Sequence, residues 1–141
     1  MVIVNLHQGE TMADQIGLYL VKVLVQKPGV DGAPSVQLNL AVNPGAGVVG
    51  GNAVITQAVA PPHGSTTVPE VRGVIHHTGL GVDKMLVSVE GQYGVSVPPP
   101  AIGTYLAKFS AALAVDNTWK GTGSFTYAGG TIEGCTVTPV D

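Results

Sequence analysis

Apolar and polar residues alternate along much of this chain, and glycine and proline interrupt the alternation. The clearest case is the segment 35–43, SVQLNLAVN. Because successive side chains of a β-strand point to opposite faces, this pattern predicts a half-buried strand. The side chains expected on its inward face are Val36, Leu38, Leu40 and Val42.

Similar stretches predict further strands on both sides of this one. They lie at 16–26, 52–59, 70–78, 82–90, 92–97, 119–127 and 131–139. Glycine, proline and Asx residues between them mark turns. We expect 63–69 to be a loop, and the sequence GLG at 79–81 to be the turn of a hairpin, since glycine is free to take positive φ.

Two segments allow more than one interpretation. Residues 16–26 are apolar on both faces except at Lys22 and Gln26, which favours a central strand or one covered on both sides. Residues 103–115 alternate as a strand does, yet their alanine content and an apolar stripe also suit a helix. The flanking sequence is made of strands and turns, so we predict a strand there as well.

Several short strands at this spacing predict an all-β fold, either an antiparallel β-sandwich or a β-barrel of roughly eight to nine strands. A chain of 141 residues is long enough for one such domain, which we place at 16–141, with residues 1–15 as an N-terminal extension. Glycines inside expected strands, namely Gly73, Gly121 and Gly123, suggest bulges or strong bends.

Charge is scarce in this chain. Charged residues make up 11% of it, against about 25% in a typical domain. The six basic residues are scattered and form no patch that could neutralise several phosphates, so we expect no nucleic-acid partner. A surface so poor in charge is prone to self-association, and it favours a protein partner or a second copy.

The sequence contains no signal for a membrane or for classical export. Its first apolar run stops at Leu6 and follows no basic segment, unlike a signal peptide, and no apolar run is long enough for a membrane helix. Aromatic residues, at 5%, are too few for the girdles of an outer-membrane barrel. A single cysteine, Cys135, allows no internal disulfide. We expect a cytoplasmic protein, with non-classical export left open.

Two adjacent histidines, His76 and His77, are the most conspicuous candidate site. Ligands of one zinc ion must converge within about 2.1 Å of it, whereas neighbouring residues of a strand diverge. We expect His76 to share the exposed face of Arg72, and His77 to lie over the edge of the core. The pair therefore predicts no metal site.

Other candidate residues also lack the surroundings that their chemistry needs. Cys135 has no base nearby in the sequence and is expected to be a half-buried strand thiol. Ser124 lies in an alternating stretch and not in a G-x-S-x-G elbow. The glycine-rich segment 45–51 lacks the Lys-Ser/Thr pair of a phosphate loop and is expected to be a turn. We therefore predict no catalytic, cofactor-binding or metal-binding residue, and no enzyme.

Three stretches carry a family resemblance: 34–43 (PSVQLNLAVN), 53–62 (AVITQAVAPP) and 119–127 (WKGTGSFTY). The most specific part is Ile55-Thr56-Gln57-Ala58 followed by Pro61-Pro62. Over roughly 18–127 the chain resembles a small family of uncharacterised bacterial proteins, catalogued as a domain of unknown function. The resemblance implies an all-β domain and transfers no catalytic residue.

Gln57 in that motif has a physical interpretation of its own. Alternation places it on the same face as Ile55, where an unpaired amide would cost about 1–3 kcal/mol. It would then fix the loop after Pro62 or line a ligand pocket, and we favour the structural role.

Two functions fit these observations best. The first is a non-catalytic β-domain that binds another protein or itself. The alternative is a carrier that holds a small apolar ligand in a barrel cavity.

Overall fold

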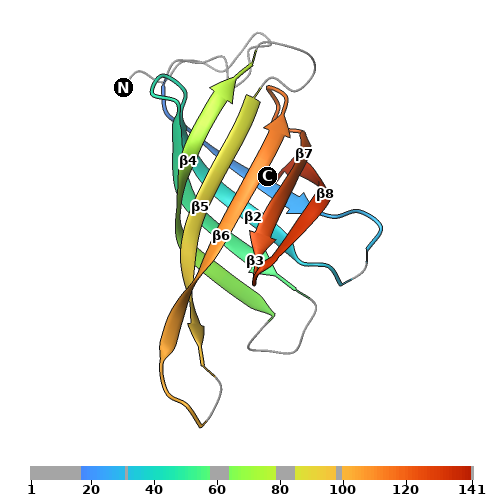
Figure 1. Cartoon of the computed structure of the whole chain (residues 1–141). Helices are drawn as coiled ribbons and strands as arrows, with labels where there is room; N and C mark the ends of the chain where they lie inside the picture. Colours follow the sequence, from blue (N-terminus) through green and yellow to red (C-terminus); the bar gives the residue numbers. More distant parts are fainter. Residues whose placement is uncertain (1–16, 31, 58–63, 79–84, 98–99, 141) are drawn as a thin grey trace.

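The protein folds as a closed antiparallel barrel of eight strands (Figure 1). The computed structural model describes residues 17–30, 32–57, 64–78, 85–97 and 100–140, and every helix or strand in these ranges is a β-strand. The strands are β1 (Tyr19–Gln26), β2 (Ser35–Asn43), β3 (Val48–Thr56), β4 (Ser65–His77), β5 (Met85–Ser96), β6 (Thr104–Val115), β7 (Gly121–Tyr127) and β8 (Gly130–Pro139). The predicted all-β class is confirmed. Of the two predicted architectures, sandwich and barrel, the protein forms the barrel.

Each strand pairs with the next strand of the chain, and β1 pairs with β8 to close the barrel. The strand predicted at 35–43 is confirmed as β2, and its four expected inward side chains are buried. The segment 103–115, which suited a strand or a helix, forms β6.

The barrel interior is filled by apolar side chains. The buried residues of all eight strands form one cluster, in which Phe109 and Phe125 are the largest side chains that are fully buried. Among the described residues no buried side chain is polar or charged. Burial of apolar surface, at about 25 cal/mol per Å², is therefore the main stabilising term of the inner face.

Several predicted boundaries were wrong. The strand expected at 119–127 begins only at Gly121, because Trp119 lies in the turn before it. Part of the loop expected at 63–69 is strand, because β4 begins at Ser65. A proline is tolerated at position 69 for two reasons. The β3–β4 ladder shifts register directly after the pair Val68–Ala53, and Pro69 has no partner on β5. Residues 92–97 form no separate strand, since β5 continues to Ser96. The third strand begins earlier than expected, at Val48.

The outer face of β1 is not covered. Leu20 is 75% exposed and Lys22 is also exposed, while Val23 and Val25 point into the core. Of the two alternatives for 16–26, a strand covered on both sides was therefore wrong, because one sheet closed on itself has only one buried face. The other holds in that β1 has a paired strand on each side, β2 and β8. The turn predicted at 79–81 lies outside the described residues, although β4 and β5 on its two sides do pair antiparallel.

Two glycines allow close packing of neighbouring strands. A Cβ atom on Gly73 would lie 1.7 Å from the Ser88 carbonyl oxygen, and one on Gly121 would lie 2.0 Å from that of Ala114. These glycines thus mark close approaches where bulges were expected. Register shifts occur where two residues of β4, 69 and 70, lie opposite Asn52, and where two residues of β8, 133 and 134, lie opposite Ser124. The extra residues are on β4 and β8, so the bulge expected at Gly123 is not found there.

One end of the barrel is sealed by the turn between β6 and β7. The Trp119 side chain is 2% exposed, and its Nε1–H donates to the Tyr19 hydroxyl at 3.3 Å. The Asp116 carboxylate holds this turn by accepting hydrogen bonds from the Thr118 N–H at 2.8 Å and the Lys120 N–H at 3.1 Å. The turn places Trp119 at a φ of 65°, which aims the indole back into the barrel.

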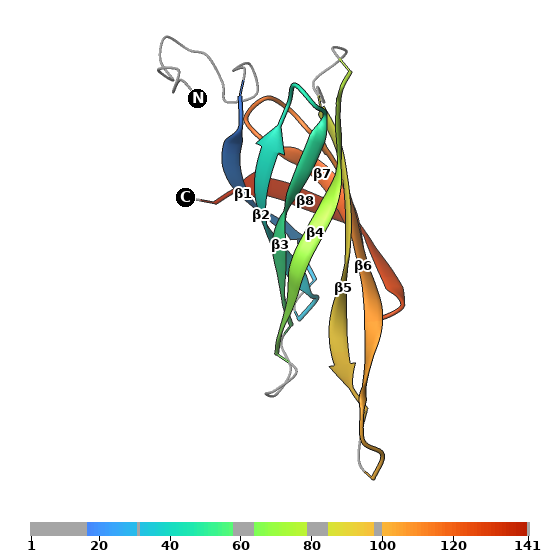
Figure 2. The same cartoon turned by 90° about the vertical axis from the view of Figure 1, so that its left-hand side faces the viewer.

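At the other end β5 and β6 run past their neighbours. The β4–β5 ladder stops at Val71 and Gly91, and the β6–β7 ladder stops at Ser110 and Thr126. Beyond these points residues 92–96 pair with 104–108 as a two-stranded ribbon, which we call the arm. Figures 1 and 2 show the arm projecting well below the barrel.

Candidate functional site

The two histidines form no site together. Both side chains are exposed at the end of β4. His76 lies outward as predicted. His77 pairs with the buried Met85 and so shares the inward face, as expected, but at the last rung of β4 its side chain is exposed instead of covering the core. Within the described ranges, no group of three or more histidine, cysteine or acidic side chains could hold a metal ion.

Cys135 is more deeply placed than predicted. Its side chain is 1% exposed on β8, and its thiol donates to the Ile132 carbonyl oxygen at 3.6 Å. Burial raises the pKa of the Cys135 thiol, so the reactive thiolate is disfavoured at neutral pH. This environment suits a structural thiol and not a nucleophile.

The remaining candidates have structural positions. Residues 44–47 form a turn, as expected for the glycine-rich segment, and the rest of that segment belongs to β3. Gln57 is half-buried just after β3, where its backbone N–H donates to the Gly64 carbonyl at 3.0 Å. The loop that its side chain was expected to fix, predicted at 63–69, is strand from Ser65 on.

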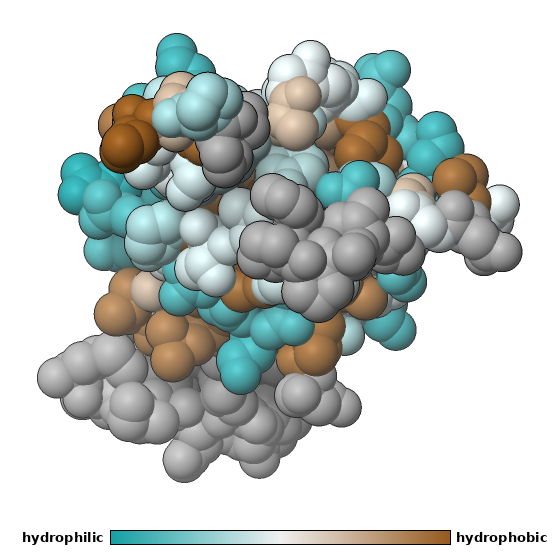
Figure 3. Space-filling view, turned by 90° about the horizontal axis from the view of Figure 1, so that it is seen from below, coloured by the Kyte–Doolittle hydropathy of each residue, from teal (hydrophilic) through white to brown (hydrophobic). Residues whose placement is uncertain are grey.

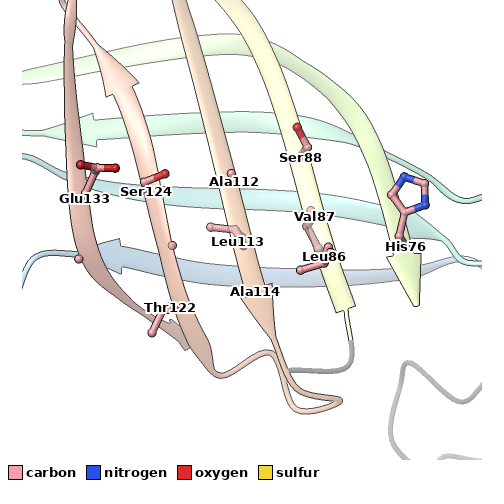
Figure 4. A pocket seen from close by; sticks show the side chains of 12 residues that line it. His76, Leu86, Val87, Ser88, Ala112, Leu113, Ala114, Thr122, Ser124 and Glu133 are labelled. Carbon is pink, nitrogen blue, oxygen red and sulfur yellow. The ribbon is translucent and has the colours of Figure 1, made fainter. Parts of the chain in front are cut away.

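A shallow hollow of about 490 Å³ crosses the outer wall of the barrel from β4 to β8 (Figure 4). We call it the wall hollow. It is lined by His76 on β4, Leu86 and Ser88 on β5, Ala112 and Ala114 on β6, Thr122 and Ser124 on β7, and Glu133 on β8.

Strand register explains the shape of the wall hollow. One row of paired residues runs from His76 through Leu86 and Ala114 to Thr122. Small side chains such as Ala112 and Ala114 form the floor of the wall hollow. Figure 4 shows His76 and Glu133 at its opposite sides. Among the described residues no hydrogen bond joins His76 to Ser88, Ser124 or Glu133, so the hollow presents no assembled nucleophile and base.

A second hollow, of about 740 Å³, opens at the end of the barrel beneath the arm. We call it the mouth; among its lining residues are Thr66, Tyr93, Val95, Tyr105, Lys108 and Tyr127. Three of the four tyrosines of the chain therefore gather here. They come from β5, β6 and β7 and point to the inner side of the sheet.

Hydrogen bonds fix two of these tyrosines. Tyr127 and Thr66 share a hydrogen bond between their hydroxyl groups at 3.2 Å, and the Ala128 N–H donates to the Tyr93 hydroxyl at 3.1 Å. The rings of Tyr93 and Tyr127 lie 5.6 Å apart. Burial raises the pKa of Tyr93, so it remains a neutral phenol at physiological pH. Tyr105, by contrast, is 54% exposed.

Only part of the mouth is predictable from the sequence. Alternation places Tyr127 on the face of Phe125, but the meeting of three tyrosines depends on how far β5 and β6 outrun β4 and β7. Those strand lengths depend on pairing between distant segments. Sequence reasoning therefore missed the mouth.

Comparison with known proteins gives a family and no activity. No curated protein matches the chain.

Within the described ranges there is no helix with the length and hydropathy needed to cross a membrane. The model of a domain of unknown function, DUF1842, matches residues 16–131, which includes the three stretches that carried the resemblance. The chain belongs to this family, whose function is unknown, and it folds as a β-barrel.

Proposed function

We propose that this domain is a non-catalytic protein-binding module that associates with a second copy of itself through the wall hollow. The observation that carries the proposal is that the wall hollow, which includes Leu86 and Ser88, adjoins an apolar stretch of outer wall, since Ser88 pairs with Val74. Val48, Val74 and Leu86 are 46%, 43% and 46% exposed, and Val48 pairs with Val74 across β3 and β4. Contiguous exposed apolar residues of this kind are typical of interaction surfaces.

The outer wall is not apolar everywhere. On β2 and β3 a chain of amides covers it: Gln37 donates to Asn39 at 3.0 Å, and Asn39 donates to Asn52 at 2.7 Å. On β4 an exposed ion pair joins Arg72 and Glu70 at 3.0 Å. These polar groups would lose hydration if another protein covered them, whereas most side chains of the wall hollow are uncharged and either small or apolar.

The arrangement of polar groups around the wall hollow suits a second copy. His76 lies at one side and Glu133 at the other, with small uncharged side chains between them. A two-fold axis through the floor would exchange the two sides, so that His76 of each copy meets Glu133 of the other. An imidazole N–H can donate to a carboxylate in this arrangement, which makes the surface complementary to itself.

The packed interior favours this proposal over the apolar-ligand carrier. A carrier of the kind weighed above needs an empty space enclosed by the barrel, whereas here large side chains such as Phe109 and Phe125 fill the centre. Both hollows described above lie on the outside or at an end of the barrel.

Sedimentation velocity of two matched variants tests the proposal. We expect the wild-type protein to form dimers at high concentration, and Leu86→Glu to be monomeric because each dimer would bury two added carboxylates. Leu20→Glu, on the exposed face of β1, should dimerise as the wild type does. A wild type that stays monomeric at millimolar concentration, or a folded Leu86→Glu that still dimerises, would contradict the proposal.

A charge exchange makes the test independent of folding effects. His76→Glu should weaken dimerisation because it brings two carboxylates together, and adding Glu133→Lys should restore it. Absence of this restoration would show that the two sides do not face each other.

A further inference from the structure

The mouth contains strand edges that lack partners. Among the described residues, 65–70 of β4 pair only with β3, and 92–96 of β5 pair only with β6. The two strands touch where their ladder ends, since a Cβ atom on Gly91 would lie 2.4 Å from the Glu70 carbonyl oxygen. Beyond that point the two strands diverge, as Figures 1 and 2 show, and no described ladder pair joins them.

The two edges differ in their protection against strand pairing. Proteins block free edges with proline and charged residues. The β4 edge contains both, in Pro69 and Glu70. Residues 92–96 of β5, QYGVS, contain neither, and Gly94 and Ser96 leave the approach to their backbone open. The outer edge of β6 at 104–108 also has no described strand partner, but it contains Lys108. Of these edges, the free edge of β5 is therefore the least protected against another strand.

The mouth beside this edge offers places for side chains. Tyr93 is held by its hydrogen bond to Ala128, and Tyr127 by its bond to Thr66, so their rings form a fixed floor. Tyr105 stands 54% exposed at the side. Lys108 is the one charged side chain among the described lining residues, which favours a partner with carboxylates over a basic one. Figure 3 shows hydrophobic and polar residues interspersed on this end of the molecule.

We propose that the mouth binds an extended, acidic peptide segment of another protein, which adds as a strand to the free edge of β5. Main-chain hydrogen bonds to residues 92–96 would supply affinity, because that edge has donors and acceptors without strand partners. Alternate side chains of the added strand would point into the mouth and contact the tyrosines. This site is separate from the wall hollow, so it stands whether or not the protein dimerises.

A phage-displayed library of random dodecapeptides provides the test, followed by fluorescence anisotropy with the selected peptides in synthetic form. We expect enriched peptides to alternate apolar residues and to contain aspartate or glutamate. Tyr105→Ala should weaken their binding about tenfold, as for an aromatic contact at an interface. Leu106→Ala is the matched control, because it removes an exposed side chain from the opposite face of the same strand and should change affinity less than about twofold.

Two further measurements distinguish strand addition from other modes of binding. Hydrogen exchange of the amides at 92–96 should slow when a selected peptide is bound, since an added strand protects the edge. Lys108→Glu should weaken binding of acidic peptides, while Lys120→Glu at the sealed end should not. The proposal is overturned if no peptide is enriched, if Tyr105→Ala binds as the wild type does, or if binding leaves the exchange of those amides unchanged.

Discussion

The two ends of this barrel use similar residues in opposite ways. At the sealed end Trp119 and Tyr19 form a buried hydrogen-bonded pair, 2% and 6% exposed. At the mouth Tyr93 and Tyr127 also accept or share hydrogen bonds, but Tyr105 beside them is 54% exposed. The difference comes from the chain around them: a tight turn folds Trp119 over one end, whereas β5 and β6 continue past the other.

The two ends therefore differ in what their aromatic side chains do: some stabilise the fold, and others are free to bind a partner. Aromatic groups that a turn covers contribute mainly to folding, and those that a projecting ribbon leaves open can contact a partner at little cost to the fold. Five substitutions test this division, in order from the largest expected effect to the smallest.

Trp119→Ala should lower the free energy of unfolding by about 3–5 kcal/mol, because it removes a large buried side chain and leaves a cavity. Urea denaturation followed by circular dichroism measures the change. A loss below about 1 kcal/mol would mean that the end of the barrel is stable without its seal.

Tyr19→Phe should destabilise the protein by about 1–3 kcal/mol, because the Trp119 N–H would remain buried without an acceptor. The matched change at the mouth, Tyr93→Phe, should cost about 1 kcal/mol or less, since Ala128 is exposed and water can replace the lost hydroxyl. Thermal denaturation of the two variants measures these losses of stability. If both variants lost the same free energy of unfolding, the two ends would not differ in how much their hydrogen bonds stabilise the fold.

Asp116→Asn should have a smaller effect that depends on pH. The hydrogen bond from Thr118, with those from backbone N–H groups, lowers the pKa of Asp116 below its ordinary value. A carboxyl group whose pKa is lower in the folded state stabilises that state above its unfolded pKa, and the stabilisation is lost as the pH falls through the folded pKa. At neutral pH the wild type should therefore unfold at a higher urea concentration than Asp116→Asn does. This difference between the two midpoints should shrink below pH of about 4. A difference that is constant from neutral to strongly acidic pH would exclude the carboxylate as its source.

Tyr105→Ala should change the free energy of unfolding by no more than about 0.5 kcal/mol, as for an exposed side chain. The same variant is expected to lose peptide binding at the mouth. A large loss of stability would place Tyr105 in the folding core of the arm and weaken its use as a binding probe.

Much of the fold follows from local sequence. The bounds of β2 and its buried side chains follow from alternation alone, and flanking turns correctly favoured a strand for β6. The choice between barrel and sandwich could not be made in this way, because it depends on contacts between β1 and β8 at opposite ends of the chain. For the same reason the covered outer face predicted for β1 was wrong.

The candidate sites were less predictable than the fold. Adjacency in sequence drew attention to His76 and His77, but strand geometry keeps them apart and both are exposed. The wall hollow and the mouth are instead assembled from cross-strand neighbours that lie far apart in sequence. Small residues such as Ala112 and Ala114 give no chemical signal until register places them beside Leu86 and Ser88.

The closure of the barrel has a consequence for the order of folding. Seven of its eight ladders join strands that follow one another along the chain, whereas the β1–β8 ladder joins Gln26 to Thr136, which are 110 residues apart. Bringing distant segments together carries a larger entropic cost than forming a hairpin. We therefore expect the hairpins to assemble first as an open, curling sheet, and the first and last strands to meet late, when most of the hydrophobic surface is already in place.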